Sequence, residues 1–312
     1  MKKIAFFGTS DRSIPILDAL KKNFELSLCV TKTDTKVGRH QESKECGVKR
    51  WASRNGVYYM DIPGFKETEV DRIIKEISDQ KIELAVVCDF AFIIPYKLVE
   101  FLKGKFINLH FSLLPKYRGA SPVQFAILNN EKITGITFHL VSKGMDDGDI
   151  IAQYEYNIPD NIASGALYDT LFKFAAEKIP STLKDFMDDN LKPILQDVSK
   201  MSLSSFPSHS KTTLIYKEDA RIEWQKSPEL IEREIRAFNP WPISWGRIGE
   251  LENNTSLLQN NLRLRPSMDT STIMKIYSAE LVNGKLKINE IQVEGRRKMN
   301  WESFKNGYLV VS

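Results

Sequence analysis

An amide and an imidazole stand two positions apart near the end of a short apolar run, as Asn108 and His110. Side chains alternate along a β-strand, so residues two apart point to the same face. If residues 106–109 form a strand that runs out into a polar loop, this amide and this imidazole face a common site. Polar side chains at strand ends often only satisfy loose backbone groups, and for an isolated pair that structural role is the more common one.

Two segments that follow favour a chemical role for this pair. The loop 112–119 carries Leu113 and Leu114 where polar residues are usual, and Pro115 stiffens it, which suits a wall for a flat organic ligand. A loop packed against its own helix explains the leucines equally well. The turn 144–149 carries three aspartates, Asp146, Asp147 and Asp149. Its spacing matches no calcium loop, and turn formation accounts for at least one of the three.

An amide, an imidazole and a carboxylate together suit acyl transfer to an amine. Negative charge develops on the carbonyl oxygen, and we expect an amide N–H of Asn108 to donate to it. His110 would donate to the same oxygen or move a proton between the attacking and leaving nitrogens. A hydrogen bond from the imidazole to an aspartate would fix the imidazole tautomer and favour its charged form. Ser112 is adjacent but lacks the turn motif of a serine nucleophile, so it is assigned no covalent role.

The elements that must position these groups follow from the alternation of short β-branched runs with helical periods in the first two hundred residues. This alternation predicts βαβ units around a parallel sheet, and such sheets bind ligands beyond the carboxyl ends of their strands. The expected strands cover residues 4–7, 26–31, 84–88, 106–109, 134–141 and 150–156. The expected helices cover residues 13–22, 67–79, 121–128, 164–190 and 229–238.

The pattern changes along the chain and predicts two domains. We expect a catalytic domain over residues 1–190 and a surface linker over 191–210, where serines and prolines concentrate. Residues 211–312 are then expected to form a small β-rich domain, with a barrel as the expected form. In that domain the pair Asn283-Gly284 lies between two alternating runs and predicts a hairpin.

The composition limits the class of protein. A net charge of +4 over 312 residues is weak evidence for a nucleic-acid partner, and the length allows two domains. The longest apolar runs fall far short of the roughly 20 residues of a membrane-spanning helix, and no signal peptide is indicated. Three cysteines, at 29, 46 and 88, and four dispersed histidines suggest neither disulfides nor a metal site. We therefore expect a soluble, cytoplasmic monomer without a metal.

The run NLHFSLLPKYRGASP at residues 108–122 resembles the signature of the 10-formyltetrahydrofolate-dependent formyltransferases. It is followed at the expected distance by Gly-Ile-Thr at 135–137 and by Met-Asp-Asp-Gly-Asp-Ile at 145–150. The resemblance implies the α/β class, with a doubly wound Rossmann-like formyltransferase domain and a smaller C-terminal β-barrel of OB-like form. It also implies 10-formyltetrahydrofolate as the co-substrate.

The same resemblance assigns roles to individual residues. Asn108, His110 and Asp146 would form the catalytic set, which leaves Asp147 and Asp149 as structural. The folate would lie against two loops, namely Asp89, Phe90, Ala91, Phe92 and Ile93 on one and Ser112, Leu113, Leu114 and Pro115 on the other.

Within the family, further segments are similar to the branch that formylates the α-amine of methionine on initiator tRNA for translation initiation. These segments are residues 7–10, 219–224, 236–242 and 291–299. The resemblance implies a tRNA acceptor end at the loop 33–47. The residues expected to contact tRNA are Lys36, Arg39, Lys44, Arg296, Arg297 and Lys298, although the last three would equally suit a solvated turn.

The loop 33–47 departs from the family because Arg39 is followed by neutral and acidic residues, including Glu42 and Glu45. Fewer positive charges weaken the attraction to phosphate, and a solvated surface loop is the alternative interpretation. Two other functions therefore stay open. One is a sugar-nucleotide N-formyltransferase with the same three catalytic residues, and the other is a tRNA- or folate-binding protein without catalysis.

Overall fold

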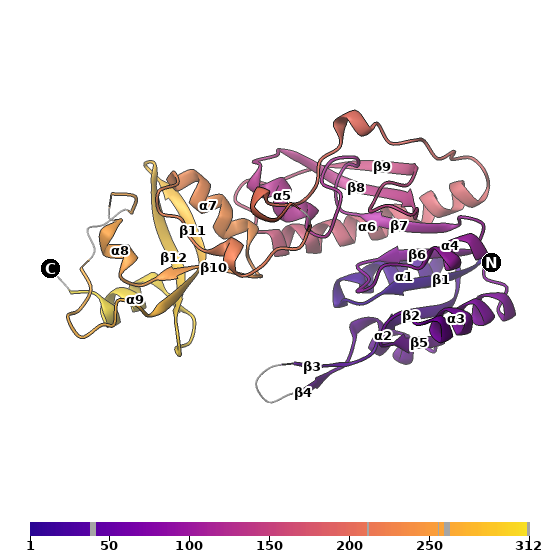
Figure 1. Ribbon diagram of the computed structural model, residues 1–312, viewed down its shortest axis with the longest axis horizontal. Coiled ribbons are helices and arrows are strands. Elements are labelled where there is room, and N and C mark those ends of the chain that lie inside the picture. The colour runs from indigo at the N-terminus through magenta and orange to yellow at the C-terminus, as the bar shows by residue number, and fades with distance from the viewer. Residues whose placement is uncertain (38–41, 211, 255, 259–262, 311–312) are drawn as a thin grey trace. The chain divides into compact units, whose positions relative to one another are not determined.

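The computed structural model describes residues 1–37, 42–210, 212–254, 256–258 and 263–310 (Figure 1). Contacts divide the chain into two compact units. The first comprises Met1–Gly119, Thr134–Tyr156 and Tyr168–Leu203, and the second comprises Ala120–Ile133, Asn157–Leu167 and Ser204–Ser312. None of the helices in these described ranges has both the length and the apolar character needed to cross a membrane.

A seven-stranded sheet forms the centre of the first unit, in the order β5-β2-β1-β6-β7-β8-β9. The strands from β5 to β7 pair in parallel, and β8 pairs antiparallel to β7. Their bounds are β1 Lys3–Gly8, β2 Glu25–Lys32, β5 Tyr59–Ile62, β6 Leu84–Cys88, β7 Phe106–His110, β8 Ile133–Leu140 and β9 Ile150–Asn157. The expected strands of this unit are confirmed, and β5 was not predicted.

Helices cover both faces of this sheet, as the doubly wound prediction requires. Four consecutive residues of the central strand β1, from Ile4 to Phe7, are 0% exposed, which needs apolar cover on both sides. On the face of Phe7, Ile73 of α3 and Leu98 of α4 belong to the same buried cluster. Helices α1 and α2 contact β2. The helices are α1 Ile14–Asn23, α2 Gly47–Asn55, α3 Glu67–Asp79, α4 Tyr96–Phe101 and α6 Ser164–Met187.

The second unit is built on a four-stranded antiparallel sheet in the order β10-β11-β12-β13. Asn283 and Gly284 both adopt positive φ, at 51° and 71°, and join β11 to β12, so the hairpin prediction is confirmed. Where a barrel was expected, the described strands form this one sheet, with β10 and β13 outermost. The elements are α5 Pro122–Leu128, α7 Pro228–Ala237, β10 Ser244–Arg247, α8 Glu250–Asn253, β11 Ile273–Val282, β12 Lys285–Val293, β13 Met299–Asn300 and α9 Trp301–Tyr308.

Two segments that were expected to be a surface loop and a surface linker, 33–47 and 191–210, contain regular backbone hydrogen bonds. Within residues 33–47, β3 (Thr35–Val37) and β4 (Glu42–Lys44) pair antiparallel. Part of the stretch 191–210 lies against the first unit, because the backbone of Ile194 bonds to that of Ile150 at the start of β9.

Candidate active site

Asn108 and His110 lie in β7, at the place where the sheet changes from parallel to antiparallel pairing. The register sets Asn108 opposite His139 of β8 and His110 opposite Thr137. Because directly opposite residues share a face, His139 brings a second imidazole ring to the site. The amide nitrogen of Asn108 lies 3.0 Å from Nε2 of His139. His139 was expected only to be one of four dispersed histidines. The signal that could have found it is the Thr-x-His alternation of β8.

The turn after β8 brings the carboxylate of Asp146 to the same face. Its Oδ1 accepts a hydrogen bond from the Asn108 amide at 3.2 Å, and its Oδ2 accepts one from the backbone N–H of Gly119 at 2.8 Å. Nδ1 of His110 and Nε2 of His139 each lie 3.6 Å from the nearest carboxylate oxygen. The structure therefore brings together the three residues that were expected to form the catalytic set.

Backbone carbonyls, rather than the aspartate, fix the tautomers of the two imidazoles. Nε2 of His110 lies 2.9 Å from the carbonyl of Tyr117, to which it donates. Nδ1 of His139 lies 2.9 Å from the carbonyl of Leu140, which leaves its Nε2 to accept from Asn108. The expected hydrogen bond from His110 to the Asp146 carboxylate is not made, since 3.6 Å exceeds hydrogen-bond length.

Burial and nearby charge act in opposite directions on His110 and Asp146. Burial lowers the pKa of His110, and the nearby carboxylate of Asp146 opposes this shift without overcoming it. The aspartate does favour the charged imidazole, as predicted, but burial outweighs it because His110 is only 6% exposed. Burial alone would raise the pKa of Asp146, but the two imidazoles and the N–H of Gly119 bring it well below its usual range. A neutral His110 thus stands beside an ionised Asp146 near pH 7.

The side-chain amide of Asn108 is oriented by charge. Both of its N–H groups are engaged, one with His139 and one with Asp146. The opposite orientation would set the amide oxygen against the carboxylate, so the observed one is favoured. Asn108 was expected to donate to the carbonyl oxygen of the substrate. It cannot do so without breaking one of these two hydrogen bonds. Its amide oxygen is the atom left for an incoming group.

The loop 89–93, expected to contact folate, follows β6 and is held by Thr9. The backbone N–H of Thr9 donates to the carbonyl of Asp89 at 3.0 Å, and its hydroxyl accepts from the N–H of Ala91 at 3.0 Å. The rings of Phe90 and Phe92 are half-buried and meet edge to face, with centroids 5.6 Å apart. Ile93 beside them is 93% exposed, which leaves an apolar side chain free at the loop tip.

The loop 112–115 is held by hydrogen bonds to the side chain of Thr137 in β8. Its hydroxyl donates to the carbonyl of Ser112 at 2.6 Å and accepts from the N–H of Leu114 at 3.1 Å. Leu114 is buried, so internal packing explains it, whereas Leu113 and Pro115 are half-buried. The hydroxyl of Ser112 donates to the carbonyl of Lys116 at 2.6 Å, which is a structural role.

The residues expected to contact tRNA are not all described. Arg39 lies outside the described residues. Lys36 belongs to strand β3, and Lys44 belongs to strand β4. In the second unit three exposed residues form the turn between β12 and β13, Arg296, Arg297 and Lys298, called the basic turn below. Nζ of Lys298 lies 2.7 Å from the carboxylate of Glu290 and 4.7 Å from the centre of the Tyr277 ring.

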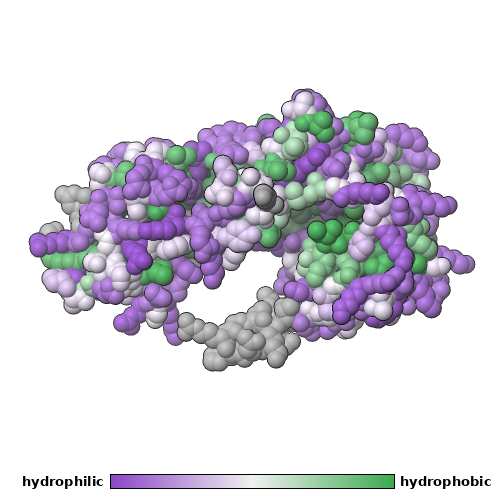
Figure 2. Space-filling view, viewed as in Figure 1, coloured by the Kyte–Doolittle hydropathy of each residue, from purple (hydrophilic) through white to green (hydrophobic). Residues whose placement is uncertain are grey.

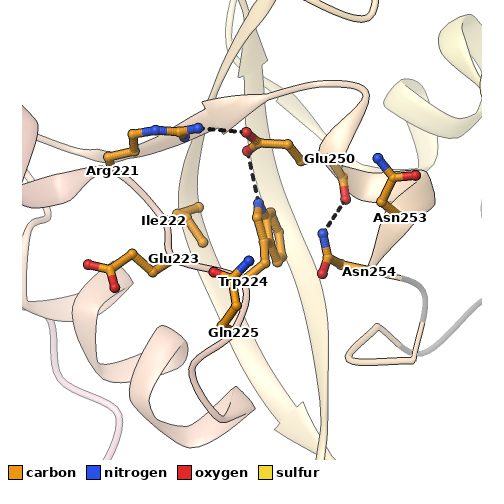
Figure 3. A pocket seen from close by; sticks show the side chains of 8 residues that line it. All are labelled: Arg221, Ile222, Glu223, Trp224, Gln225, Glu250, Asn253 and Asn254. Atoms are coloured by element: carbon orange, nitrogen blue, oxygen red, sulfur yellow. Dashed lines mark hydrogen bonds and ion pairs between the residues drawn. The ribbon is translucent and has the colours of Figure 1, made fainter.

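The second unit also contains a pocket of about 500 Å³ that the sequence analysis did not predict (Figure 3). The carboxylate of Glu250 points between two of its lining residues and accepts hydrogen bonds from Arg221 at 2.8 Å and from the indole of Trp224 at 3.0 Å. Its Oε2 also accepts from the N–H of Arg247 at 3.0 Å. Because these bonds occupy Glu250, the cluster holds the fold of this unit together.

Comparison with known proteins identifies the family. Residues 2–183 match the family described as formyl transferase, and residues 214–309 match its C-terminal domain. The chain belongs to the formyl transferase family. The methionyl-tRNA formyltransferase of Clostridium novyi is 31% identical to this formyltransferase over 309 residues, which cover 98% of this chain and 96% of that protein.

Solved structures share the fold of this formyltransferase. A methionyl-tRNA formyltransferase from Clostridium thermocellum matches with a TM-score of 0.59 at 15% identity, over 94% of this chain and 99% of that one. An N-formyltransferase from Helicobacter canadensis, solved with folinic acid and dTDP-3-aminofucose, matches with a TM-score of 0.58 at 20% identity, over 94% and 98% of the two chains.

Proposed function

We propose that this formyltransferase moves the formyl group of 10-formyltetrahydrofolate to the α-amine of methionine on initiator tRNA, in the cytoplasm, for translation initiation. The observation that supports the amine acceptor is the 31% identity to the Clostridium novyi methionyl-tRNA formyltransferase, which spans 98% of the chain and thus both units. A match confined to residues 2–183 would support only the shared formyl-transfer chemistry.

In this proposal Asn108, His110 and Asp146 carry the reaction. The amide oxygen of Asn108 accepts an N–H of the incoming amine and orients it, because both amide N–H groups are already engaged. His110, kept neutral by burial, accepts the proton that the amine loses and passes it to the folate nitrogen as the bond from that nitrogen to the formyl carbon breaks. The ionised Asp146, 3.6 Å from Nδ1 of His110, stabilises the imidazolium that forms.

The folate supplies an activated formyl group attached to a nitrogen that can leave. Loops 89–93 and 112–115 would hold it, and they follow adjacent parallel strands, β6 and β7, so they lie at one edge of the sheet. The half-buried ring of Phe92 and the exposed side chain of Ile93 offer the apolar surface that a flat ring system would cover, so the residues fit this ligand.

The test is formation of formylmethionyl-tRNA from charged initiator tRNA and 10-formyltetrahydrofolate. Asn108→Ala and His110→Ala should lower the rate about 10²- to 10⁴-fold with little loss of tRNA binding. Full activity in both variants would mean that the catalytic assignment is wrong. A wild-type protein that binds tRNA and folate without forming product would overturn the proposal in favour of a binding protein.

A sugar-nucleotide N-formyltransferase is the second candidate, and the observation that favours it is the weakly basic composition of residues 33–47. A direct comparison of charged initiator tRNA with amino-sugar nucleotides distinguishes the two, and formylation of the sugar alone would support this candidate. Arg39→Ala provides a second test, since it should weaken the use of tRNA far more than the use of folate. Equal effects on both substrates would argue against a role at the acceptor stem.

A further inference from the structure

A short strap, residues 194–202, follows α6 and is bound to both loops that carry the catalytic centre. At one end the backbone of Ile194 exchanges two hydrogen bonds with that of Ile150, both 2.8 Å. At the other end the carbonyl of Ser202 accepts from the N–H of Arg118 at 2.9 Å. The exposed side chains of the strap are mixed, with apolar Val198 between polar Asp197 and Ser199. Figure 2 shows the same mixture of green and purple on this face of the first unit.

Gln196, inside the strap, uses the whole hydrogen-bonding capacity of its amide. Its Nε2 donates to the carbonyl of Asp146 at 2.9 Å and to that of Gly148 at 2.7 Å. Its Oε1 accepts from Nε and Nη2 of Arg118, at 3.0 and 2.6 Å. The residue is 9% exposed, so these bonds are shielded from bulk water. One side chain thus ties the turn 144–149 to the loop 112–119.

Each of the two joined segments contains a residue with a left-handed backbone. Asp146 has φ of 49° and Tyr117 has φ of 59°. Such conformations are uncommon for residues other than glycine and persist where surrounding contacts hold them. Gln196 holds the carbonyl of Asp146 directly and the side chain of Arg118, which follows Tyr117. The carboxylate of Asp146 and the carbonyl of Tyr117 both face His110.

We propose that Gln196 is a positioning residue for formyl transfer, which holds the Asp146 backbone so that its carboxylate meets Asn108, Gly119 and His110. Gln196 acts through Asp146 and needs no contact with either substrate. The inference rests on the proposed function in one respect, namely that the transfer uses the Asp146 carboxylate.

The kinetic test is a double-mutant cycle of Gln196→Met with Asp146→Asn. Methionine keeps the length of the side chain and removes all four hydrogen bonds, so kcat should fall about 10- to 100-fold while KM for both substrates changes less than about threefold. In the Asp146→Asn background the same change should lower kcat less than about threefold further, because the residue on which Gln196 acts is already impaired. Full additivity of the two effects would overturn the proposal.

A second measurement does not depend on activity. The N–H of Gly119 donates to the Asp146 carboxylate, so its hydrogen exchange should rise at least about tenfold in Gln196→Met. Unchanged exchange would overturn the inference. The matched control is Val198→Ser on the same strap, which should leave both kcat and this exchange rate unchanged.

Gln196→Glu serves if the methionine variant folds poorly. It keeps an acceptor for Arg118 but turns a carboxylate toward the carbonyls of Asp146 and Gly148, so it too should lower kcat and expose the Gly119 N–H. Wild-type levels of both would contradict the proposal. A wild type that formylates an amino-sugar nucleotide instead of tRNA would overturn the proposed function alone, and the same cycle would then be run with the sugar.

Discussion

The proposed catalytic centre of the first unit and the basic turn of the second unit are held by opposite kinds of contact. At the centre, His110 and His139 are 6% and 2% exposed, and each ring donates to a backbone carbonyl. In the basic turn, Arg296 and Arg297 are exposed, and within the described part of the chain neither forms an ion pair. Buried hydrogen bonds act at fixed distances, whereas exposed charges act through a field that salt screens. The centre should therefore respond to single atoms, and the basic turn to charge and salt.

The largest effect should come from Asp146→Asn. The change preserves shape but removes the charge that stabilises a protonated His110, and it sets an amide N–H where Gly119 donates. We expect kcat to fall about 10²- to 10⁴-fold with tRNA affinity within about twofold of wild type, measured by single-turnover formylation and filter binding. Asp147→Asn is the control, since Asp147 is exposed and, among the residues that the structure describes, accepts only from Ser142. An equal loss of tRNA binding would break the contrast between the two regions.

A smaller and different effect should follow from removing two charges of the basic turn. Arg296→Ala with Arg297→Ala should weaken tRNA binding about tenfold at moderate salt and reduce the slope of log K against log salt by about two. The value of kcat at saturating tRNA should stay unchanged. A fall in kcat without a change in the salt slope would show that the basic turn does not act through phosphate attraction.

The pH dependence should sharpen the contrast further. Because burial lowers the pKa of His110, the acid limb of kcat/KM should lie below the ordinary imidazole value of 6.5, and activity should be lost only as pH falls through the lowered value. At pH 6 the protein should keep a larger share of its maximal activity than an enzyme with an ordinary histidine base. In Asp146→Asn the carboxylate no longer opposes the shift, so an NMR titration should give a still lower pKa for His110. A limb above 6.5 would contradict this charge assignment.

The smallest effect should come from Lys298→Ala. Its ammonium group already pairs with Glu290 at 2.7 Å and is half-exposed, so it is less available to phosphate than its two neighbours. Exposed ion pairs of this kind contribute little to stability. The affinity for tRNA should therefore change by less than about twofold, and the free energy of unfolding by less than about 1 kcal/mol. A loss as large as that from Arg296 would show that the pair with Glu290 opens when tRNA binds.

The parts of the fold that follow local patterns were predictable from the sequence. Strands such as β6 are buried on both faces and appear as unbroken apolar runs, and the hairpin at Asn283 follows from local turn chemistry. The edge strand β5 has four residues and alternating burial, which leaves too short a pattern to detect. Helix α2 buries Val48, Trp51 and Ala52, which have helical spacing. This helix was not predicted, because the apolar residues stand among charged ones in the sequence.

The residues of the proposed catalytic centre were predictable as a set that lies together, but their hydrogen-bond network was not. Asn108 and His110 are separated by a strand period, which fixes their common face before any tertiary contact is known. His139 joins them through a strand register 31 residues away, and Gln196 contacts Asp146 across 50 residues. The tautomer of His110 depends on a carbonyl in a left-handed turn. Contacts of this kind depend on the folded backbone, so no spacing along the chain reveals them.

The antiparallel pairing of β7 with β8 limits which changes in chain length this centre can tolerate. Successive side chains of β8 alternate between faces, so deletion or insertion of one residue within it would turn His139 away from Asn108. The same slip would withdraw the hydroxyl of Thr137 from the loop at Ser112. Two supports of the site would thus fail together, one for an imidazole and one for a loop. Homologous chains can be expected to vary in length on either side of β8 but not between Thr137 and His139.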